Sequence, residues 1–416
     1  MNGVPRTLAI RIIGYIGLRD LIPLYAFYAL FFGDAGLSVA QISSLFVIWS
    51  VTAIVFEVPS GAWADTASRR ALLTLSSLLY AVAFVAWIVT PTYAGFAAGF
   101  VLWGISGALM SGTIEALAYD ELAMIDATRG YAGLMGWANS ASVIAILIAT
   151  VVAAPLYAVG GYALVGWVSV GVALLQGVIA LSLPSVPQVA EADEVEAPGL
   201  VAAKVGVGCR YLMMLRAGLR EAARHRPVRN VLLVSSLVLG LYTYDEYLAL
   251  LADEKDVATA AIALLVAITS LGEAVGTVLA GRTSRSRNAV LAGMLVVAAA
   301  FLAAGAIVGG VLGFVGLAIA SGLHNNVIVV IEARLQDAIE GPARATVTSV
   351  SGLLAELVAI TTFAIYAIGS AWFSISTLIV LLALPLAAVA LLLPSRTPLP
   401  AAADIDEGTG HEGGVI

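Results

Sequence analysis

The sequence predicts an all-α integral membrane protein with twelve transmembrane helices in two pseudo-symmetric six-helix bundles. Three observations predict it: 61% of the 416 residues are hydrophobic, only 11% are charged, and the long apolar runs fall six and six around a polar gap. Soluble domains carry about 25% charged residues, so this chain could not cover its own surface in water. High hydrophobicity with low charge also excludes intrinsic disorder for the chain as a whole.

Twelve runs are long enough to cross a bilayer, which takes about 20 apolar residues per helix. They lie near residues 12–33, 40–62, 71–91, 94–117, 133–156, 162–183, 230–251, 257–280, 288–309, 311–333, 345–368 and 372–393. They are too long and too uniformly apolar for barrel strands, so each is predicted as a helix. The first run is long and eleven more follow it, which favours a membrane anchor over a cleaved signal peptide.

These runs predict an N-terminal bundle over residues 1–183, a linker over 184–229, a C-terminal bundle over 230–394 and a disordered tail over 395–416. Within the linker, residues 208–225 have the pattern of a basic amphipathic helix, which is expected to lie in the membrane interface. Two interpretations stay open: a plain linker helix on the leaflet, or a regulatory site for lipid or protein. The single cysteine, Cys209, lies here and excludes an internal disulfide.

The basic residues fall almost entirely on one side of the predicted membrane. If every run crosses, 18 of the 20 Lys and Arg residues share a side, and the exceptions are Arg19 and Lys255. The positive-inside rule then places both termini in the cytoplasm. Arginine greatly outnumbers lysine and alanine is abundant, as in proteins from GC-rich bacteria, so we expect a multi-pass protein of the bacterial plasma (inner) membrane. The net charge of −7 gives no indication of nucleic-acid binding.

The two halves repeat weakly. Glu57 and Glu273 are 216 residues apart, and Glu115 and Glu332 are 217 apart. Internal repeats are typical of secondary transporters, whose substrate sites lie between the repeats near the middle of the membrane. Because Glu57 and Glu273 are related by the repeat, a structural role is favoured for them. Glu332 is likewise expected to be structural, at the end of its helix.

The most specific motif follows the second run: Gly61-Ala-Trp-Ala-Asp65-Thr-Ala-Ser-Arg69-Arg70. It resembles the G-x-x-x-D-x-x-G-[RK]-[RK] loop of the major facilitator superfamily, with Ser68 where glycine is usual. The six-plus-six arrangement of runs resembles that family over essentially the whole chain. The resemblance implies a gating loop in which Asp65 latches the cytoplasmic face, with Arg69 and a carboxylate of the fourth helix, Glu115 or Asp120.

Ionisable groups inside the hydrocarbon region are costly and suggest function. Asp20, Asp245 and Glu356 are candidates for proton coupling, and the resemblance, which implies that the first helix of each triplet lines the cavity, favours Asp20 and Asp245. Glu356 could instead be a protonated carboxyl hydrogen-bonded to a neighbouring helix. Arg19 is either part of a substrate site or in a structural ion pair with Glu57 or Glu273.

Several polar and aromatic residues are candidates for substrate contact. His324-Asn325-Asn326 stand near the middle of the tenth run, where helix–helix hydrogen bonding is the alternative. Tyr25, Trp103 and Asn139 could add to the lining, although any one of them is more commonly a packing or interfacial residue.

The sequence therefore predicts a secondary active transporter of a small organic molecule, a drug or metabolite, most simply a proton-coupled antiporter acting in efflux by alternating access. Drug antiporters of the family usually carry a further motif, G-x-x-x-G-P-x-x-G-G, in the fifth helix. The sequence around Pro155 does not match it. A proton-coupled importer or a uniporter of a nutrient is therefore the alternative, and a non-transporting receptor or assembly partner is another. No P-loop, metal-ligand spacing or nucleophile motif is present, so an enzyme, a cofactor and a metal are not expected. The expected partners are substrate, protons and the lipid bilayer, with a monomeric protein.

Overall fold

The computed structural model describes residues 4–184, 226–338 and 344–393, and its secondary structure there is entirely helical. The linker beyond residue 184, including the predicted amphipathic helix over 208–225 and Cys209, and the tail predicted over 395–416, lie outside the described residues. Eleven helical segments are long and apolar enough to cross a membrane, and one of them, Thr128–Ser182, has 55 residues. That segment contains two crossings, because its backbone leaves helical geometry at Gly160 and Gly161. The prediction of twelve crossings in an all-helical membrane protein is confirmed.

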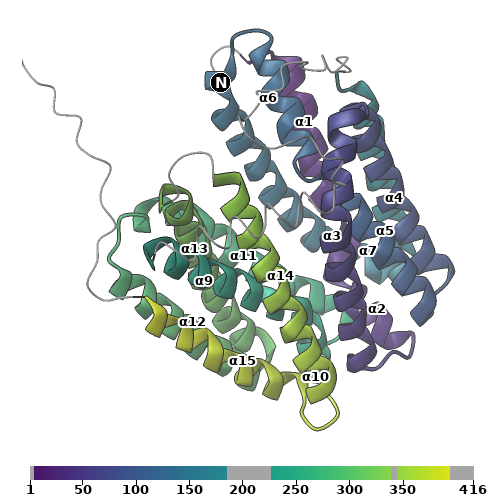
Figure 1. Cartoon of the computed structure of the whole chain (residues 1–416). Helices are drawn as coiled ribbons and strands as arrows, with labels where there is room; N and C mark the ends of the chain where they lie inside the picture. Colours follow the sequence, from purple (N-terminus) through teal and green to yellow (C-terminus); the bar gives the residue numbers. More distant parts are fainter. Residues whose placement is uncertain (1–3, 185–225, 339–343, 394–416) are drawn as a thin grey trace, which may run out of the picture.

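The first half of the chain forms the bundle drawn in purple and blue in Figure 1. Its elements are α1 (Arg6–Asp20), η1 (Pro23–Ala26), α2 (Tyr28–Asp34), α3 (Val39–Thr66), α4 (Arg69–Val89), α5 (Tyr93–Met110), α6 (Thr113–Ala123), η2 (Thr128–Gly130) and α7 (Tyr131–Ser182). Helix α3 begins at a capping box in which Ser38 and Gln41 satisfy each other's backbone N–H groups. Gly112, at φ 72°, separates α5 from α6 within one crossing.

The second half forms the bundle drawn in green and yellow in Figure 1. Its elements are α9 (Arg226–Leu241), η3 (Tyr242–Tyr247), α10 (Leu248–Glu254), α11 (Thr259–Thr283), α12 (Asn288–Val308), α13 (Gly310–Ala338), α14 (Arg344–Gly369), α15 (Ile375–Val389) and η5 (Ala390–Leu392). Glu254 accepts hydrogen bonds from the backbone N–H groups of Ile375, at 2.6 Å, and Ser376, at 3.2 Å. A carboxylate at this helix N-terminus stabilises the start of α15.

The first and seventh crossings are interrupted, where the apolar runs predicted continuous helices. In the first crossing, α1 ends at Asp20 and the chain resumes as a 3₁₀ turn that starts at Pro23. Proline has no backbone N–H to continue the ladder and clashes with the preceding turn. In the seventh crossing, Tyr242–Tyr247 form a 3₁₀ helix between α9 and α10. Discontinuous helices near the membrane centre commonly contribute to transporter binding sites.

Small residues let α11 and α13 approach very closely. A Cβ atom added to Gly272 would lie 2.1 Å from the carbonyl oxygen of Ala318, and one on Gly276 would lie 2.1 Å from that of Gly322. Asn326 also donates a hydrogen bond to the Gly276 carbonyl, at 2.9 Å. Close backbone contact and interhelical hydrogen bonds are the main sources of helix association in a bilayer.

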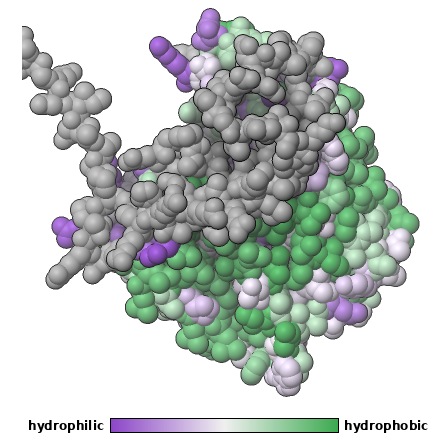
Figure 2. All heavy atoms as spheres, viewed as in Figure 1, coloured by the Kyte–Doolittle hydropathy of each residue, from purple (hydrophilic) through white to green (hydrophobic). Residues whose placement is uncertain are grey.

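The outer surface is suited to lipid. In Figure 2, hydrophobic residues cover most of the visible described surface, and the most hydrophilic residues lie mainly towards its edges. Large apolar side chains are strongly exposed among the described residues, for example Val278 at 75% and Leu312 at 80% of their surface. Exposed apolar surface on this scale is typical of a protein that sits in a membrane.

The two bundles meet through related pairs of helices. Helix α3 packs against α14, α7 against α11, and the short α2 against α10. Several arginines, including Arg6, Arg69, Arg129 and Arg285, lie at or near one end of the crossings, which we call the basic end. The bundles touch towards the opposite end: Ser43 hydrogen-bonds Tyr247 at 2.7 Å, and Phe46 lies 5.2 Å, ring to ring, from Phe363.

Candidate functional site

A cavity of about 630 Å³ lies where the two bundles face each other. Its walls come from α3 of the first bundle and from α9, η3 and α14 of the second. The lining runs along α14 from Phe363 to Thr348, close to the start of that helix at the basic end. The aromatic contacts of Phe46 lie beyond Phe363, so the cavity is closed at one end and extends towards the basic end. Its volume is in the range of small-molecule sites.

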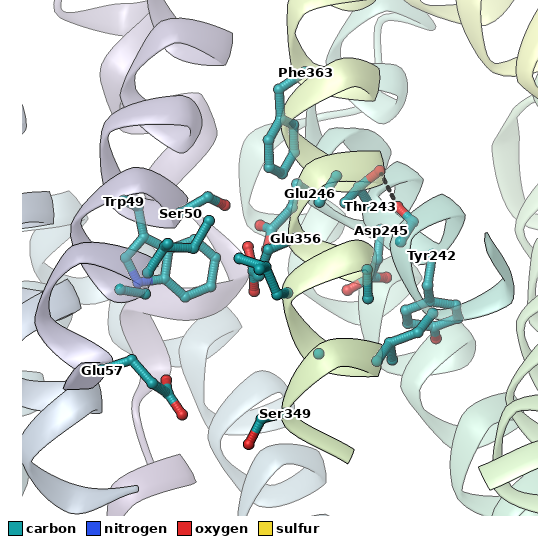
Figure 3. A pocket seen from close by; sticks show the side chains of 18 of the residues that line it. Trp49, Ser50, Glu57, Tyr242, Thr243, Asp245, Glu246, Ser349, Glu356 and Phe363 are labelled. Carbon is teal, nitrogen blue, oxygen red and sulfur yellow. Dashed lines mark hydrogen bonds between the residues drawn. The ribbon is translucent and has the colours of Figure 1, made fainter. Parts of the chain in front are cut away.

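The ionisable residues that line this cavity are all acidic. Glu57 comes from α3, Asp245 and Glu246 from η3, and Glu356 from α14. Figure 3 shows these side chains reaching into the space between the helices from both bundles. Within the described residues, the one ion pair is Arg69 with Asp120, so none of the four carboxylates is paired with a cation there. Four unpaired carboxylates in one cavity repel each other and are strong candidates for binding positive charge or protons.

Local backbone geometry explains how η3 contributes several of these groups. In a 3₁₀ helix residues three apart eclipse each other, so Tyr242 and Asp245 lie on the same side. Both line the cavity, together with Thr243 and Glu246. The buried hydroxyl of Tyr242 faces Glu273 on α11 but makes no hydrogen bond of acceptable geometry, and neither does the buried Oε1 atom of Glu273. Glu273 therefore stands behind the cavity wall, next to Tyr242.

Ser50 on α3 lies near Glu356 on α14, and both residues line the cavity. Aromatic rings complete the lining: Trp49 on α3, Tyr242 on η3 and Phe363 on α14. Trp103 and Tyr25 lie behind Trp49, with ring centroids 5.0 Å apart for Trp49–Trp103 and 5.3 Å for Tyr25–Trp103. Tyr25 and Trp103 thus support the cavity wall in this conformation and do not line it.

Two of the predicted proton-coupling residues, Asp245 and Glu356, are brought together in the cavity, and the third is not. Asp20 ends α1 and accepts a hydrogen bond from Ser142 on α7, inside the first bundle. Glu57, predicted to be structural by its repeat partner, lines the cavity. Glu246 was not among the predicted site residues, although its position beside Asp245 in a membrane-spanning run is the signal that identifies it. Trp49 and Phe363 have no sequence signal that separates them from packing residues.

Arg19 forms neither of the two expected ion pairs. Its side chain is 8% exposed, donates a 2.7 Å hydrogen bond to the Ser106 hydroxyl, and places its guanidinium carbon 3.9 Å from the centroid of the Tyr80 ring. The expectation of a pair with Glu57 or Glu273 is corrected, because α1 turns Arg19 towards α4 and α5 of its own bundle. A stacked aromatic face and a hydroxyl stabilise the buried cation instead.

The polar triplet of α13 hydrogen-bonds to protein groups. The His324 ring is buried and lies 2.9 Å from the Val238 carbonyl oxygen. Asn325 donates to the Thr277 hydroxyl at 2.9 Å, and Asn326 accepts a hydrogen bond from Thr283 at 2.7 Å. These contacts agree with the alternative interpretation of the triplet, hydrogen bonding between helices. Asn139 is exposed on α7 and Glu332 on α13, and neither lines the cavity.

The predicted gating loop lies at the basic end, between α3 and α4. The side chain of Asp65 lies outside the described residues, while Gly61 is exposed with open space around it. Arg69 forms an ion pair with Asp120 on α6, and the Nε atom of Arg69 is buried without a hydrogen-bond partner. Glu115, in the first turn of α6, has a buried Oε2 atom without a partner. Of the two candidate carboxylates, Asp120 is the one in contact with Arg69.

The exposure of the Arg69–Asp120 pair predicts that its loss has a small effect on stability, whereas the expected gating role predicts a larger effect on transport. Because the two side chains are 22% and 57% exposed, Asp120→Asn should lower stability by less than about 1 kcal/mol. If the pair positions the gating loop, the same variant changes turnover, and the charge-swapped double variant Arg69→Asp/Asp120→Arg restores part of it. Thermal melting and flux measured on the same preparations check both parts. Unchanged turnover in both single variants, Arg69→Gln and Asp120→Asn, would contradict the gating role.

Two bundles of membrane helices, related by a repeat and enclosing a central cavity, define a transporter-like membrane protein. The sequence model of the Major Facilitator Superfamily matches residues 12–360, and the chain belongs to that family. No curated protein sequence matches the chain. The family match confirms the resemblance that the motif over residues 61–70 and the arrangement of apolar runs indicated. The chain is therefore a multi-pass membrane protein with the fold of this transporter family.

Solved structures share the fold at low sequence identity. A mutant form of the nucleoside transporter NupG is 13% identical, with a TM-score of 0.72 over 93% of this chain and 98% of that one. The POT family transporter PepTSo is 12% identical, with a TM-score of 0.67 over 94% of this chain and 97% of that one. A bacterial homologue of the iron transporter ferroportin in its inward-facing state is 13% identical, with a TM-score of 0.64 over 94% and 98%. Together these similarities show the architecture, while the substrate depends on the cavity residues.

Proposed function

We propose that this protein is a proton-coupled secondary transporter that moves a small organic molecule across a bacterial plasma membrane by alternating access, in the direction of export. The observation that carries the proposal is the central cavity, whose four carboxylates come from both bundles and have no cationic partner in the described residues. Carboxylates so placed can take up and release protons as the bundles rock. Asp245 and Glu356 are the proposed coupling residues, with Glu57 and Glu246 beside them.

The proposed orientation places the basic end in the cytoplasm, by the positive-inside rule. The cavity extends towards that end, and the bundles meet at the other through Ser43–Tyr247 and the Phe46–Phe363 contact. The structure then corresponds to a state open to the cytoplasm, from which an exported molecule would enter. Closing the basic end would bring the gating loop, with Asp65, against the second bundle. We therefore expect Asp65→Asn to slow transport without loss of membrane insertion.

Flux in proteoliposomes tests the proposal. The purified protein is reconstituted, a gradient of one pH unit is imposed, and movement of labelled cationic, neutral and anionic compounds is followed with and without a protonophore. Movement that depends on the protein and collapses with the protonophore supports proton-coupled transport. Protein-dependent movement that ignores the gradient supports a uniporter and removes the coupling. Uptake in the opposite direction supports an importer, and no movement of any compound supports a non-transporting receptor.

A further inference from the structure

The cavity has one sign of charge. Four carboxylates line it, those of Glu57, Asp245, Glu246 and Glu356, and the described residues that line it include no lysine, arginine or histidine. The arginine predicted for a substrate site, Arg19, is buried against Ser106 and Tyr80 in its own bundle. The carboxylates would therefore repel an anionic molecule here, with no lining cation to offset that repulsion.

The rest of the lining favours a ligand that has an apolar part beside its positive charge. Three aromatic rings, those of Trp49, Tyr242 and Phe363, reach the cavity from three different elements. Aliphatic residues such as Ile54 and Leu353 also line it. Aromatic faces attract cations, by about 0.5 to 2 kcal/mol each.

The carboxylates are spread over separate helices and do not form a compact ligand set. Among the described residues, no group of three or more His, Cys, Asp and Glu is placed to hold a metal ion. Glu57 and Glu356 stand on facing helices, while Asp245 and Glu246 are neighbours on η3. Such an arrangement suits a bulky cation whose charge is distributed or shielded by apolar groups.

We infer that the cavity binds an organic cation, an aromatic or otherwise apolar molecule with an ammonium, phosphonium or similar group, and rejects its anionic counterpart. This inference rests on the proposed transport function and names the substrate class of the same cavity. Between the bundles, the cation neutralises the carboxylates of η3, and the aromatic rings cover its apolar body. Burial of unpaired carboxylates is unfavourable, so a bound cation also lowers the free energy of the occupied cavity.

A pair of probes with the same shape and opposite charge tests the inference. Binding of tetraphenylphosphonium and tetraphenylborate to the purified full-length protein is measured by equilibrium dialysis, with empty detergent micelles as the blank. The expected result is saturable binding of the phosphonium, weakened by added salt, and no saturable binding of the borate. If the phosphonium shows no saturable binding, or if both probes bind equally, the inference is overturned.

Isosteric variants locate the binding. Asp245→Asn and Glu246→Gln should each weaken phosphonium binding by about tenfold or more, because each removes a charge from a partly desolvated pair. The matched control is Asp253→Asn, which neutralises an exposed carboxylate near the end of α10, outside the cavity. Thermal melting of each variant verifies that it is folded. Equal binding by the cavity variants and the control would place the probe elsewhere and overturn the site.

The inference and the proposed function fail separately. If a neutral or anionic compound is transported with protons in proteoliposomes while the phosphonium does not bind, proton-coupled transport stands and the cation preference is overturned. If the phosphonium binds as expected but no compound moves, the cavity is a cation site and the transport proposal is lost.

Discussion

The Glu356→Gln variant should bind substrate and lose the ability to concentrate it against a pH gradient. An electroneutral exchange of one proton for one cation against one pH unit supports at most about a tenfold concentration ratio, since one unit corresponds to about 1.36 kcal/mol. A glutamine keeps the shape of the side chain and can still hydrogen-bond, but it cannot take up and release a proton as a carboxylate does. Flux should then continue only until the concentrations are equal. The measurement is the steady-state distribution of a substrate found in the proteoliposome panel.

Two matched variants make that result interpretable. Glu121→Gln neutralises a carboxylate on α6 outside the cavity and should retain concentrative transport. Asp20→Asn neutralises a predicted coupling residue that is hydrogen-bonded to Ser142 away from the cavity. Retained coupling in Asp20→Asn would remove Asp20 from the coupling residues. Concentrative transport by Glu356→Gln itself would show that the proton is carried elsewhere, with Asp245 the next residue to neutralise.

The Gly276→Ala variant should be strongly destabilising. The new Cβ would lie 2.1 Å from the Gly322 carbonyl oxygen, and a backbone atom cannot rotate away as a side chain can. Forcing α11 from α13 also strains the Asn326–Gly276 hydrogen bond. Overpacking of this kind costs about 1 to 3 kcal/mol or more. The measurement is thermal melting of the detergent-solubilised protein.

A glycine on the same helix supplies the control. Gly281 has open space around its hypothetical Cβ atom, so Gly281→Ala should leave the melting temperature unchanged or raise it, because alanine favours a helix by up to about 1 kcal/mol over glycine. Equal melting of Gly276→Ala and Gly281→Ala would mean that the α11–α13 contact is looser than the structure shows. The comparison separates a packing effect from the general effect of a glycine on helix stability.

The site was only partly predictable from the sequence. Asp245 and Glu356 were identified because a carboxylate in an apolar run is costly and therefore conspicuous. The same reasoning also selected Asp20 and Arg19. In the structure these two residues form hydrogen bonds with Ser142 and Ser106, respectively, inside the first bundle. A charged residue is easy to recognise in an apolar run of the sequence. The direction in which its side chain points depends on how its helix is rotated relative to the neighbouring helices.

Aromatic and polar residues were harder still to assign. Trp49 lines the cavity and Trp103 stands directly behind it, although both are tryptophans in apolar runs. His324 and its two asparagine neighbours could equally have faced a substrate or another helix, and packing against α9 and α11 uses their hydrogen bonds. Nothing in local sequence separates these outcomes, since both environments are apolar with a few polar partners.

The sequence by itself determined the fold class, the twelve crossings and the placement of basic residues at one end, because these follow from the free energy of each run in lipid or water. The tertiary structure decided which acidic groups share a space. Glu57, the adjacent pair Asp245 and Glu246, and Glu356 come from three distant parts of the chain. They meet only because α3 and α14 pack across the junction of the bundles and η3 interrupts its helix between them. Helix rotation and the breaks in the first and seventh crossings depend on contacts between distant segments, which no single run of residues records.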